Sequence, residues 1–171
     1  QELLAAYEKN LGKDHQLTLR CYSNLCENYL KRKQLNSALE MAIQIAQKYE
    51  LKHGIDNPDT LVAKTRLGKI YLELGKIREA RNQFQSVFET RRSILGLHNI
   101  LTLEALCDMA NCNNMLGENN GNIGSLNEVL ATCTVLYGED HEVTQYLKNR
   151  VRGDYYINER QLAGQTVYGM D

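Results

Sequence analysis

The sequence repeats a short motif every 42 residues, and this repeat constrains the fold more than any other feature of the chain. The motif is LGKDHQLTL at Leu11, HGIDNPDTL at His53, LGLHNILTL at Leu95 and, in a weaker form, YGEDHEVTQ at Tyr137. Repeats of about 20 to 50 residues are typical of solenoids, in which each unit contacts only its neighbours. We therefore expect an elongated array whose core runs along its length.

An amphipathic segment follows each of the first three motifs. Its apolar residues recur at three- and four-residue spacing, which predicts a helix. A break comes next, with Gly75 and Gly117 where a helix C-terminus favours a left-handed residue, and second helices are predicted at about 36–52 and 77–94. The repeating unit is therefore a helical hairpin, and we predict an all-α fold. The first helices begin with TLRCYSNLCENYLKR, TLVAKTRLGKIYLEL and TLEALCDMANCNNML, at Thr18, Thr60 and Thr102.

The repeated motif has the features of a helix start. Asn57 is a good N-cap, Pro58 suits the first helical position, and Asp59 faces the positive end of the helix. A position that exchanges histidine for asparagine between repeats is unsuited to acid–base catalysis, which also needs a convergent second group. The residues that replace Asn57 in the other copies are His15, Asn99 and His141.

The composition argues against several classes of protein. Twenty Lys and Arg balance 21 Asp and Glu, and no basic block suggests nucleic-acid binding. No apolar run approaches the length of a membrane span, and the first residues, QELLAAYEKN, do not resemble a signal peptide. We expect a soluble, cytoplasmic protein.

The cysteines do not indicate a metal site or a disulfide framework. They number five, and an odd count fits reduced thiols. Cys21 and Cys26, like Cys107 and Cys112, are separated by roughly 140° around a helix, so neither pair can bind one metal from one face. The chain also lacks a Ser/His/Asp grouping and a phosphate-binding loop. We predict no cofactor, no metal and no enzymatic activity.

The hairpin pattern resembles the tetratricopeptide repeat. The family's Leu-Gly-x-x-Tyr motif matches Leu67, Gly68 and Tyr71, and its small and aromatic residues in the second helix match Ala80 and Phe84. Small residues at these places let the two helices approach closely. The corresponding residues are Leu25, Cys26, Tyr29, Ala38 and Ala42 in the hairpin before, and Met109, Ala110, Asn113, Asn122 and Leu126 in the hairpin after.

The period of 42 residues is similar to that of the long repeats of kinesin light chains and of NLR-like signalling ATPases, and the run ETRRSILGLHNILTL is most similar to the latter. The resemblance implies an α-solenoid that winds as a right-handed superhelix. We expect one array: the end of an upstream repeat at 1–15, repeats at 16–57, 58–99 and 100–141, and a partial repeat or C-terminal cap at 142–171.

The resemblance also implies a concave groove lined by the first helix of each hairpin. The positions that the family turns inward are Arg20, Ser23, Glu27, Thr65, Lys69, Leu72, Glu104, Cys107, Asn111, Asn114 and Asn149. The Lys-plus-Asn pairing with which some relatives clamp a C-terminal carboxylate is absent, so a chaperone-tail receptor is not predicted. Asparagine amides can bind an extended peptide through donor and acceptor, although the same asparagines also fit a frayed third repeat.

We therefore expect a non-catalytic interaction module that binds a peptide or helical segment of another protein, as a fragment of a larger scaffold or signalling protein. An alternative is a peptide- or small-ligand-sensing domain of an NLR-like ATPase. The array also exposes end faces that further repeats normally cover, which predicts weak self-association.

Overall fold

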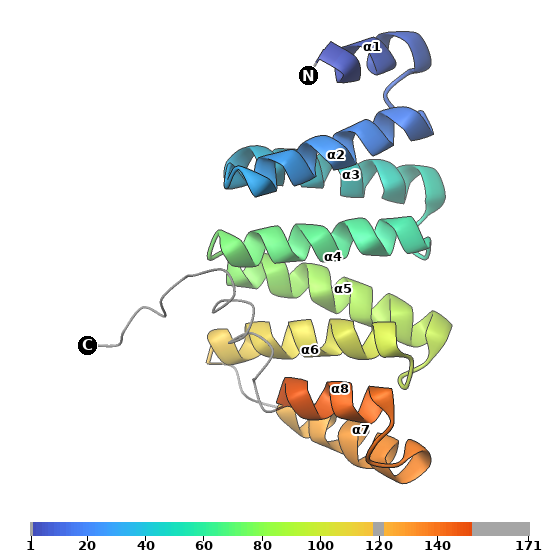
Figure 1. The fold of residues 1–171 in the computed structure, drawn as a ribbon, viewed down its shortest axis with the longest axis vertical. Coiled ribbons are helices and arrows are strands. Elements are labelled where there is room, and N and C mark those ends of the chain that lie inside the picture. Colours follow the sequence, from blue (N-terminus) through green and yellow to red (C-terminus); the bar gives the residue numbers. More distant parts are fainter. Residues whose placement is uncertain (1, 118–121, 152–171) are drawn as a thin grey trace, which may run out of the picture.

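The structure, a computed structural model, describes residues 2–117 and 122–151. These residues form eight helices and no strand, which confirms the predicted all-α fold (Figure 1). The helices are α1 (Glu2–Leu11), α2 (Gln16–Lys31), α3 (Leu35–His53), α4 (Pro58–Glu73), α5 (Ile77–Leu95), α6 (Ile100–Met115), α7 (Asn122–Tyr137) and α8 (Glu142–Val151).

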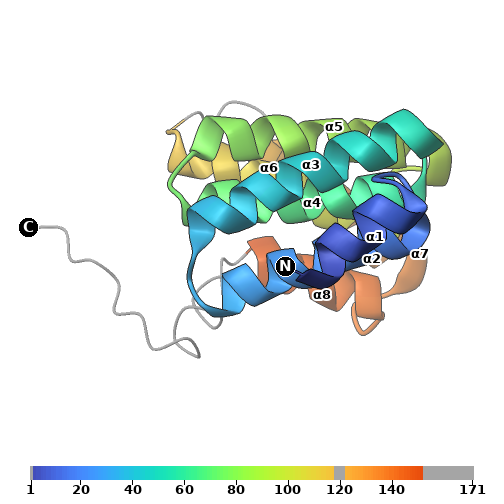
Figure 2. The same cartoon turned by 90° about the horizontal axis from the view of Figure 1, so that it is seen from above.

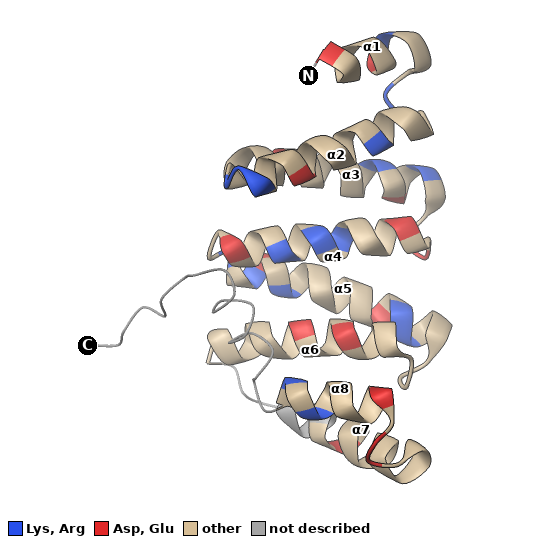
Figure 3. Cartoon of the chain, viewed as in Figure 1, with Lys and Arg blue, Asp and Glu red and all other residues tan. Residues whose placement is uncertain are grey.

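Consecutive helices pack as antiparallel hairpins that stack along one axis, from α1 at one end to α7 and α8 at the other (Figure 1). Helices α2, α4, α6 and α8 begin at residues 16, 58, 100 and 142, each 42 residues after the last. Viewed along the stack, α3 and α5 form a layer behind α2 and α4 (Figure 2). Charged residues of both signs occur along the stack (Figure 3). The arrangement is the α-solenoid expected from the repeat.

The N-caps explain why the repeated motif begins each of these helices. The side chains of His15, Asn57, Asn99 and His141 each accept a hydrogen bond from the backbone N–H two residues later, at 3.2, 2.9, 2.9 and 3.3 Å. This bond satisfies one of the orphan N–H groups of a helix N-terminus. Histidine Nδ1 and asparagine Oδ1 therefore serve the same structural purpose.

The turn inside each hairpin needs a left-handed residue. Gly75 and Gly117 hold φ at +73° and +71°, as the sequence predicted. At the same place in the first complete hairpin stands Lys33, which the backbone holds at φ +55°. The Lys33 N–H donates to the carbonyl oxygen of Leu30 at 2.9 Å, and the N–H of Gln34 donates to the carbonyl oxygen of Tyr29 at 2.9 Å. These two bonds form the usual C-terminal cap of a helix.

The core is a line of clusters rather than one centre. One cluster joins α2, α3 and α4 around Ala42 and Leu67, and another joins α5, α6, α7 and α8 around Phe84 and Leu147. A small third cluster, of Leu61, Val87 and Ala105, connects α4, α5 and α6. Each hairpin therefore buries its apolar face against its neighbours, as expected of a repeat array.

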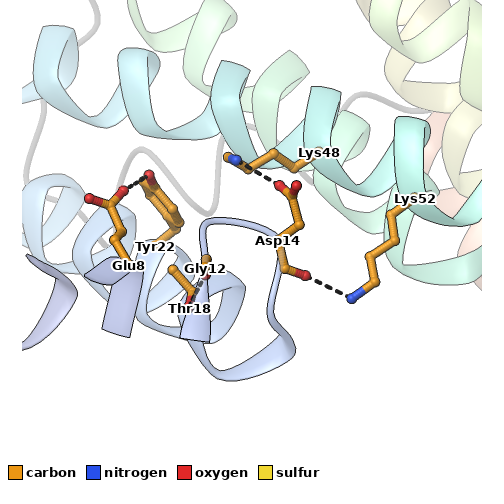
Figure 4. Close-up of polar contacts among 7 residues, drawn as sticks. All are labelled: Glu8, Gly12, Asp14, Thr18, Tyr22, Lys48 and Lys52. Carbon is orange, nitrogen blue, oxygen red and sulfur yellow. Dashed lines mark hydrogen bonds and ion pairs between the residues drawn. The ribbon is translucent and has the colours of Figure 1, made fainter. Parts of the chain in front are cut away.

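The first joint is fastened to α3 by polar contacts (Figure 4). The hydroxyl of Thr18 donates to the carbonyl oxygen of Gly12 at 2.8 Å. Lys48 Nζ lies 2.9 Å from Asp14 Oδ1, and Lys52 Nζ donates to the Asp14 carbonyl oxygen at 2.7 Å. The Lys48 ammonium, as hydrogen-bond donor and charge, holds the pKa of Asp14 below its ordinary value of 3.8.

Helix α1 is held less firmly than the others. None of its side chains is buried, although Leu4 packs against the core cluster of α2 and α3. The Tyr22 hydroxyl on α2 donates to the carboxylate of Glu8 (Figure 4). Burial, and then this carboxylate, raises the pKa of Tyr22 to about 12.

Some of the predicted features lie outside the described residues. These are the asparagine run at 118–121, residues 152–171 of the expected partial repeat or cap, and the side chains of Asn122 and Leu126. Among the described helices, none combines the length and hydrophobicity that a bilayer crossing requires.

Candidate functional site

The first helix of each hairpin contributes to one continuous face of the stack. Helices α2, α4, α6 and α8 lie in order along the front of the molecule in Figure 1. Because the repeat is 42 residues long, residues in the same register line up from one helix to the next. We call the first helix of each hairpin helix A, and the surface formed by α2, α4, α6 and α8 the helix A face.

The structure places ten of the eleven predicted groove residues at least partly at the surface. Arg20, Glu27, Lys69, Asn114 and Asn149 are exposed. The half-buried members are Ser23, Thr65, Leu72, Glu104 and Asn111. The structure buries Cys107.

Two of these residues belong to the core more than to the surface. Cys107 is 4% exposed and lies in the core cluster of α5 to α8, and Leu72 packs against the same cluster. Burial raises the pKa of Cys107 to about 11 despite the nearby Arg150 guanidinium, so the thiol stays protonated at neutral pH. We do not include Cys107 in the proposed contact surface.

A cross-repeat ion pair links α2 to α4 on the helix A face. Arg66 Nη2 lies 3.3 Å from Glu27 Oε1. Both side chains are partly exposed, so the pair contributes little to stability. It does set the position of the Glu27 carboxylate, which is thereby less available to a partner.

A second cross-repeat pair links α6 to α8 and is far better buried. Arg150 Nη2 lies 2.5 Å from Asp108 Oδ1, and the two side chains are 5% and 9% exposed. The Arg150 guanidinium also lies 5.9 Å from the ring centre of Tyr146. Burial raises the pKa of Tyr146 well above its ordinary value. These side chains fix α8 against α6.

The polar groups left for a partner lie mainly on α4 and α6. Lys69 is exposed and forms no ion pair within residues 2–117 and 122–151. The hydroxyl of Thr65 is already used, because it donates to the Leu61 carbonyl oxygen at 2.9 Å within its own helix. The amide of Asn111 makes a weak contact of 3.7 Å with the sulfur of Met115. Lys69 and Asn111, one repeat apart, are the clearest available pair.

The residues that the sequence analysis missed share one register position. Asn24, Arg66, Asp108 and Arg150 follow one another at 42-residue intervals, and three of them carry a charge. The recurrence of charged residues at this position is a sequence signal for contacts between repeats. The sequence analysis did not use it, because the groove residues were taken from the positions that the family turns inward, and this position is not one of them.

The described part of the chain shows no arrangement for metal binding. Nowhere in residues 2–117 and 122–151 do three His, Cys, Asp or Glu side chains come close enough to hold an ion. Cys133 Sγ lies 4.0 Å from His98 Nδ1, but the thiol is fully buried and burial raises its pKa.

Sequence comparison identifies a family for part of the chain. Residues 22–93 match the tetratricopeptide repeat family. The chain is also similar to Protein KINESIN LIGHT CHAIN-RELATED 2 of Arabidopsis thaliana, with 34% identity over 83 residues. That match covers 48% of this chain but only 12% of the plant protein, so the chain corresponds to a small portion of that relative.

Structural comparison extends the likeness to nearly the whole chain. A crystal structure described as the nearly identical TPR-like repeats of a Podosopora anserina putative kinesin light chain aligns with a TM-score of 0.80 at 20% identity, and the alignment covers 95% of this chain and 78% of that one. BtubC (BKLC) from P. vanneervenii aligns with a TM-score of 0.62 at 13% identity, and covers 91% of this chain and 68% of its own. The family match thus assigns tetratricopeptide repeats to residues 22–93, and the shared fold extends the stack of helical hairpins over nearly the whole chain.

Proposed function

We propose that this domain is a non-catalytic module that binds an extended or helical segment of another protein along the helix A face. Tetratricopeptide arrays generally serve protein–protein interaction, and the fold supports that broad role here. The observation that carries the finer proposal is the row of surface side chains in register on α2, α4 and α6, which consists of Glu27, Lys69 and Asn111.

The chemistry of this row suits a polypeptide partner. Lys69 offers a charge without a competing ion pair in the described residues, and Asn111 offers an amide that can donate to and accept from a peptide backbone. Elsewhere on the helix A face, Glu104 and Arg20 add charges of opposite sign. Mixed charges and amides favour a specific peptide over a simple polyanion.

A peptide selected by display against the domain is the probe for this proposal. Replacing Lys69 and Asn111 together by Ala should weaken its binding by about 1 to 3 kcal/mol, which is the scale of lost charge-assisted and amide hydrogen bonds. Isothermal titration calorimetry measures the affinity, and circular dichroism verifies that the helices persist.

The matched control removes one cation and one amide from α5, in the other layer. Asn82→Ala with Arg92→Ala changes two exposed side chains and should leave the affinity unchanged. If the control pair abolishes binding while the Lys69 and Asn111 pair does not, the partner uses the second-helix layer and the proposal is wrong.

A further inference from the structure

Five cations lie at one edge of the solenoid, where the two helices of a hairpin meet. Lys31 ends α2, and Arg32 and Lys33 lie in the turn that follows. In the next hairpin, Lys76 lies in the turn between α4 and α5, and Arg78 is in the first turn of α5. Both turns lie at the same side of the stack (Figures 1 and 3). We call these five residues the basic edge.

All five side chains of the basic edge are available to a ligand. Each residue is exposed, and none takes part in an ion pair within the part of the chain that the structure describes. The exposed carboxylates nearest in sequence are Glu73 and Glu79, which leaves an excess of positive charge in a chain whose formal net charge is −1.

Lys33 occupies a position where a lysine is structurally unfavourable. Its φ of +55° lies in the left-handed region, which glycine adopts without strain and a lysine does not. The next two hairpins have Gly75 and Gly117 at this place. Backbone strain of this kind tends to occur at functional positions. The first turn therefore carries Lys33 although a glycine there would make the fold more stable.

The second turn shows the same preference for positive charge. Lys76 is the N-cap of α5 and makes no capping bond with its side chain, although Asn and Ser are the residues that cap well. Lys76 and Arg78 also face the positive end of the α5 dipole, which disfavours cations. By contrast, Lys31 and Arg32 suit the C-terminus of α2. Helix stability therefore explains two of the five cations and opposes the other three.

We propose that the basic edge is a second docking surface, separate from the helix A face, and that its ligand is an acidic segment of a protein. Charge complementarity identifies the ligand as anionic. None of the exposed large apolar side chains lies within either turn, which disfavours insertion into a lipid surface. The two turns also have no aromatic side chain on which a base could stack. An acidic peptide needs neither.

The test measures binding of a fluorescein-labelled deca-glutamate peptide by anisotropy at low salt. The edge variant carries Lys31→Gln, Arg32→Gln, Lys33→Gln, Lys76→Gln and Arg78→Gln. The control variant removes five exposed cations elsewhere, through Lys9→Gln, Lys13→Gln, Arg20→Gln, Lys69→Gln and Arg92→Gln. The two variants have the same net charge. The control also removes Arg20 and Lys69, the two cations among the predicted groove residues of the helix A face.

We expect the edge variant to lose at least tenfold in affinity and the control to lose less than twofold, with binding weakened by added salt. Equal losses in the two variants would mean that only net charge matters, and a larger loss in the control would move the acidic ligand to the helix A face. Either result overturns the proposal. So would tighter binding of a ten-nucleotide single-stranded DNA, or of phosphatidylserine vesicles, than of the peptide at the same salt concentration.

A single substitution separates the charge of Lys33 from its structural effect. Lys33→Gly relieves the left-handed backbone, so it should raise the thermal midpoint while it weakens peptide binding severalfold. Lys33→Asn, which tolerates this backbone conformation better than lysine, should weaken binding to the same extent. If either variant binds the peptide as tightly as the unmodified chain does, Lys33 is not part of the docking surface.

Discussion

At the scale of single residues, each hairpin packs a small residue on its first helix against a residue on its second helix whose side chain fills the remaining space. Gly68 lies against the fully buried ring of Phe84. One repeat earlier the pair is Cys26 and Ala42, and the Cys26 thiol lies 3.5 Å from the carbonyl oxygen of Ala38. The space between the helices is thus filled differently from one hairpin to the next.

We predict that Gly68→Ala destabilises the domain although alanine is the better helix former. The added Cβ would lie 2.7 and 2.8 Å from two ring atoms of Phe84. Overpacking of this kind costs about 1 to 3 kcal/mol, against a gain of about 1 kcal/mol in helix propensity. Urea unfolding measures the change.

Combining this change with Phe84→Leu provides the control, since the smaller side chain gives the new Cβ room. The double variant should be less destabilised than the sum of the single variants. Strictly additive effects would show that Gly68 and Phe84 do not compete for the same space.

At the scale of helices, a buried ion pair holds α8 against α6. Asp108 and Arg150 are both nearly inaccessible to solvent, so either charge left alone would be buried without compensation. The apolar side of α8 adds Leu147, which is fully buried in the core cluster. Polar and apolar contacts together dock this short helix.

We predict that Arg150→Met loosens α8 without unfolding the rest of the array. Hydrogen exchange of the α8 amides should accelerate at least tenfold, while the amides of α2 to α5 keep their protection. The double variant with Arg150→Met and Asp108→Leu should recover much of the protection of the α8 amides, because an apolar pair can replace a buried ion pair. Loss of protection throughout the chain would contradict this local role.

The joint between α1 and α2 gives a prediction about pH. Lys48 lowers the pKa of Asp14, so the pair stabilises the fold fully above the ordinary pKa of 3.8, and the contribution is lost as the pH falls through the lower folded value. Carbon-13 NMR of the Asp14 carboxyl group should show a midpoint below 3.8. Lys48→Gln should return that midpoint towards 3.8, whereas Lys9→Gln should leave it unchanged.

The sequence predicted the hairpins and the caps because both depend on residues close together in the chain. Asn57 and Gly75 act on their own helix ends, so the repeat alone locates them. The ion pair of Glu27 with Arg66 joins residues 39 apart, which meet only once the hairpins stack. Cys107 has the register of a surface residue, but the packing of α5 to α8 buries it.

At the scale of the whole molecule, the linear stack of described helices has an end face at α1 that no other described helix covers (Figure 1). At the N-terminal end, α1 buries no side chain and Leu3 is 59% exposed. We propose that the 171-residue chain self-associates weakly through such end faces.

Light scattering across a range of concentrations should show a mass that rises above that of one chain. Leu3→Gln should reduce the rise because it removes an apolar contact from the end face. Leu51→Gln changes a side chain that is 89% exposed on α3, away from the ends, and should have no effect. A constant monomer mass at all concentrations would refute self-association.

A core arranged as a line also determines how the molecule responds to force. The cluster around Ala42 and the cluster around Leu147 meet at Tyr71 of α4, which packs against both, and the small cluster of Leu61, Val87 and Ala105 adds a second link between α4, α5 and α6. Tension along the long axis would therefore be absorbed by small rotations between neighbouring hairpins, each of which keeps its own internal packing. The domain should behave as a soft spring, which lets two bodies attached to its opposite ends move apart and return without any helix unwinding.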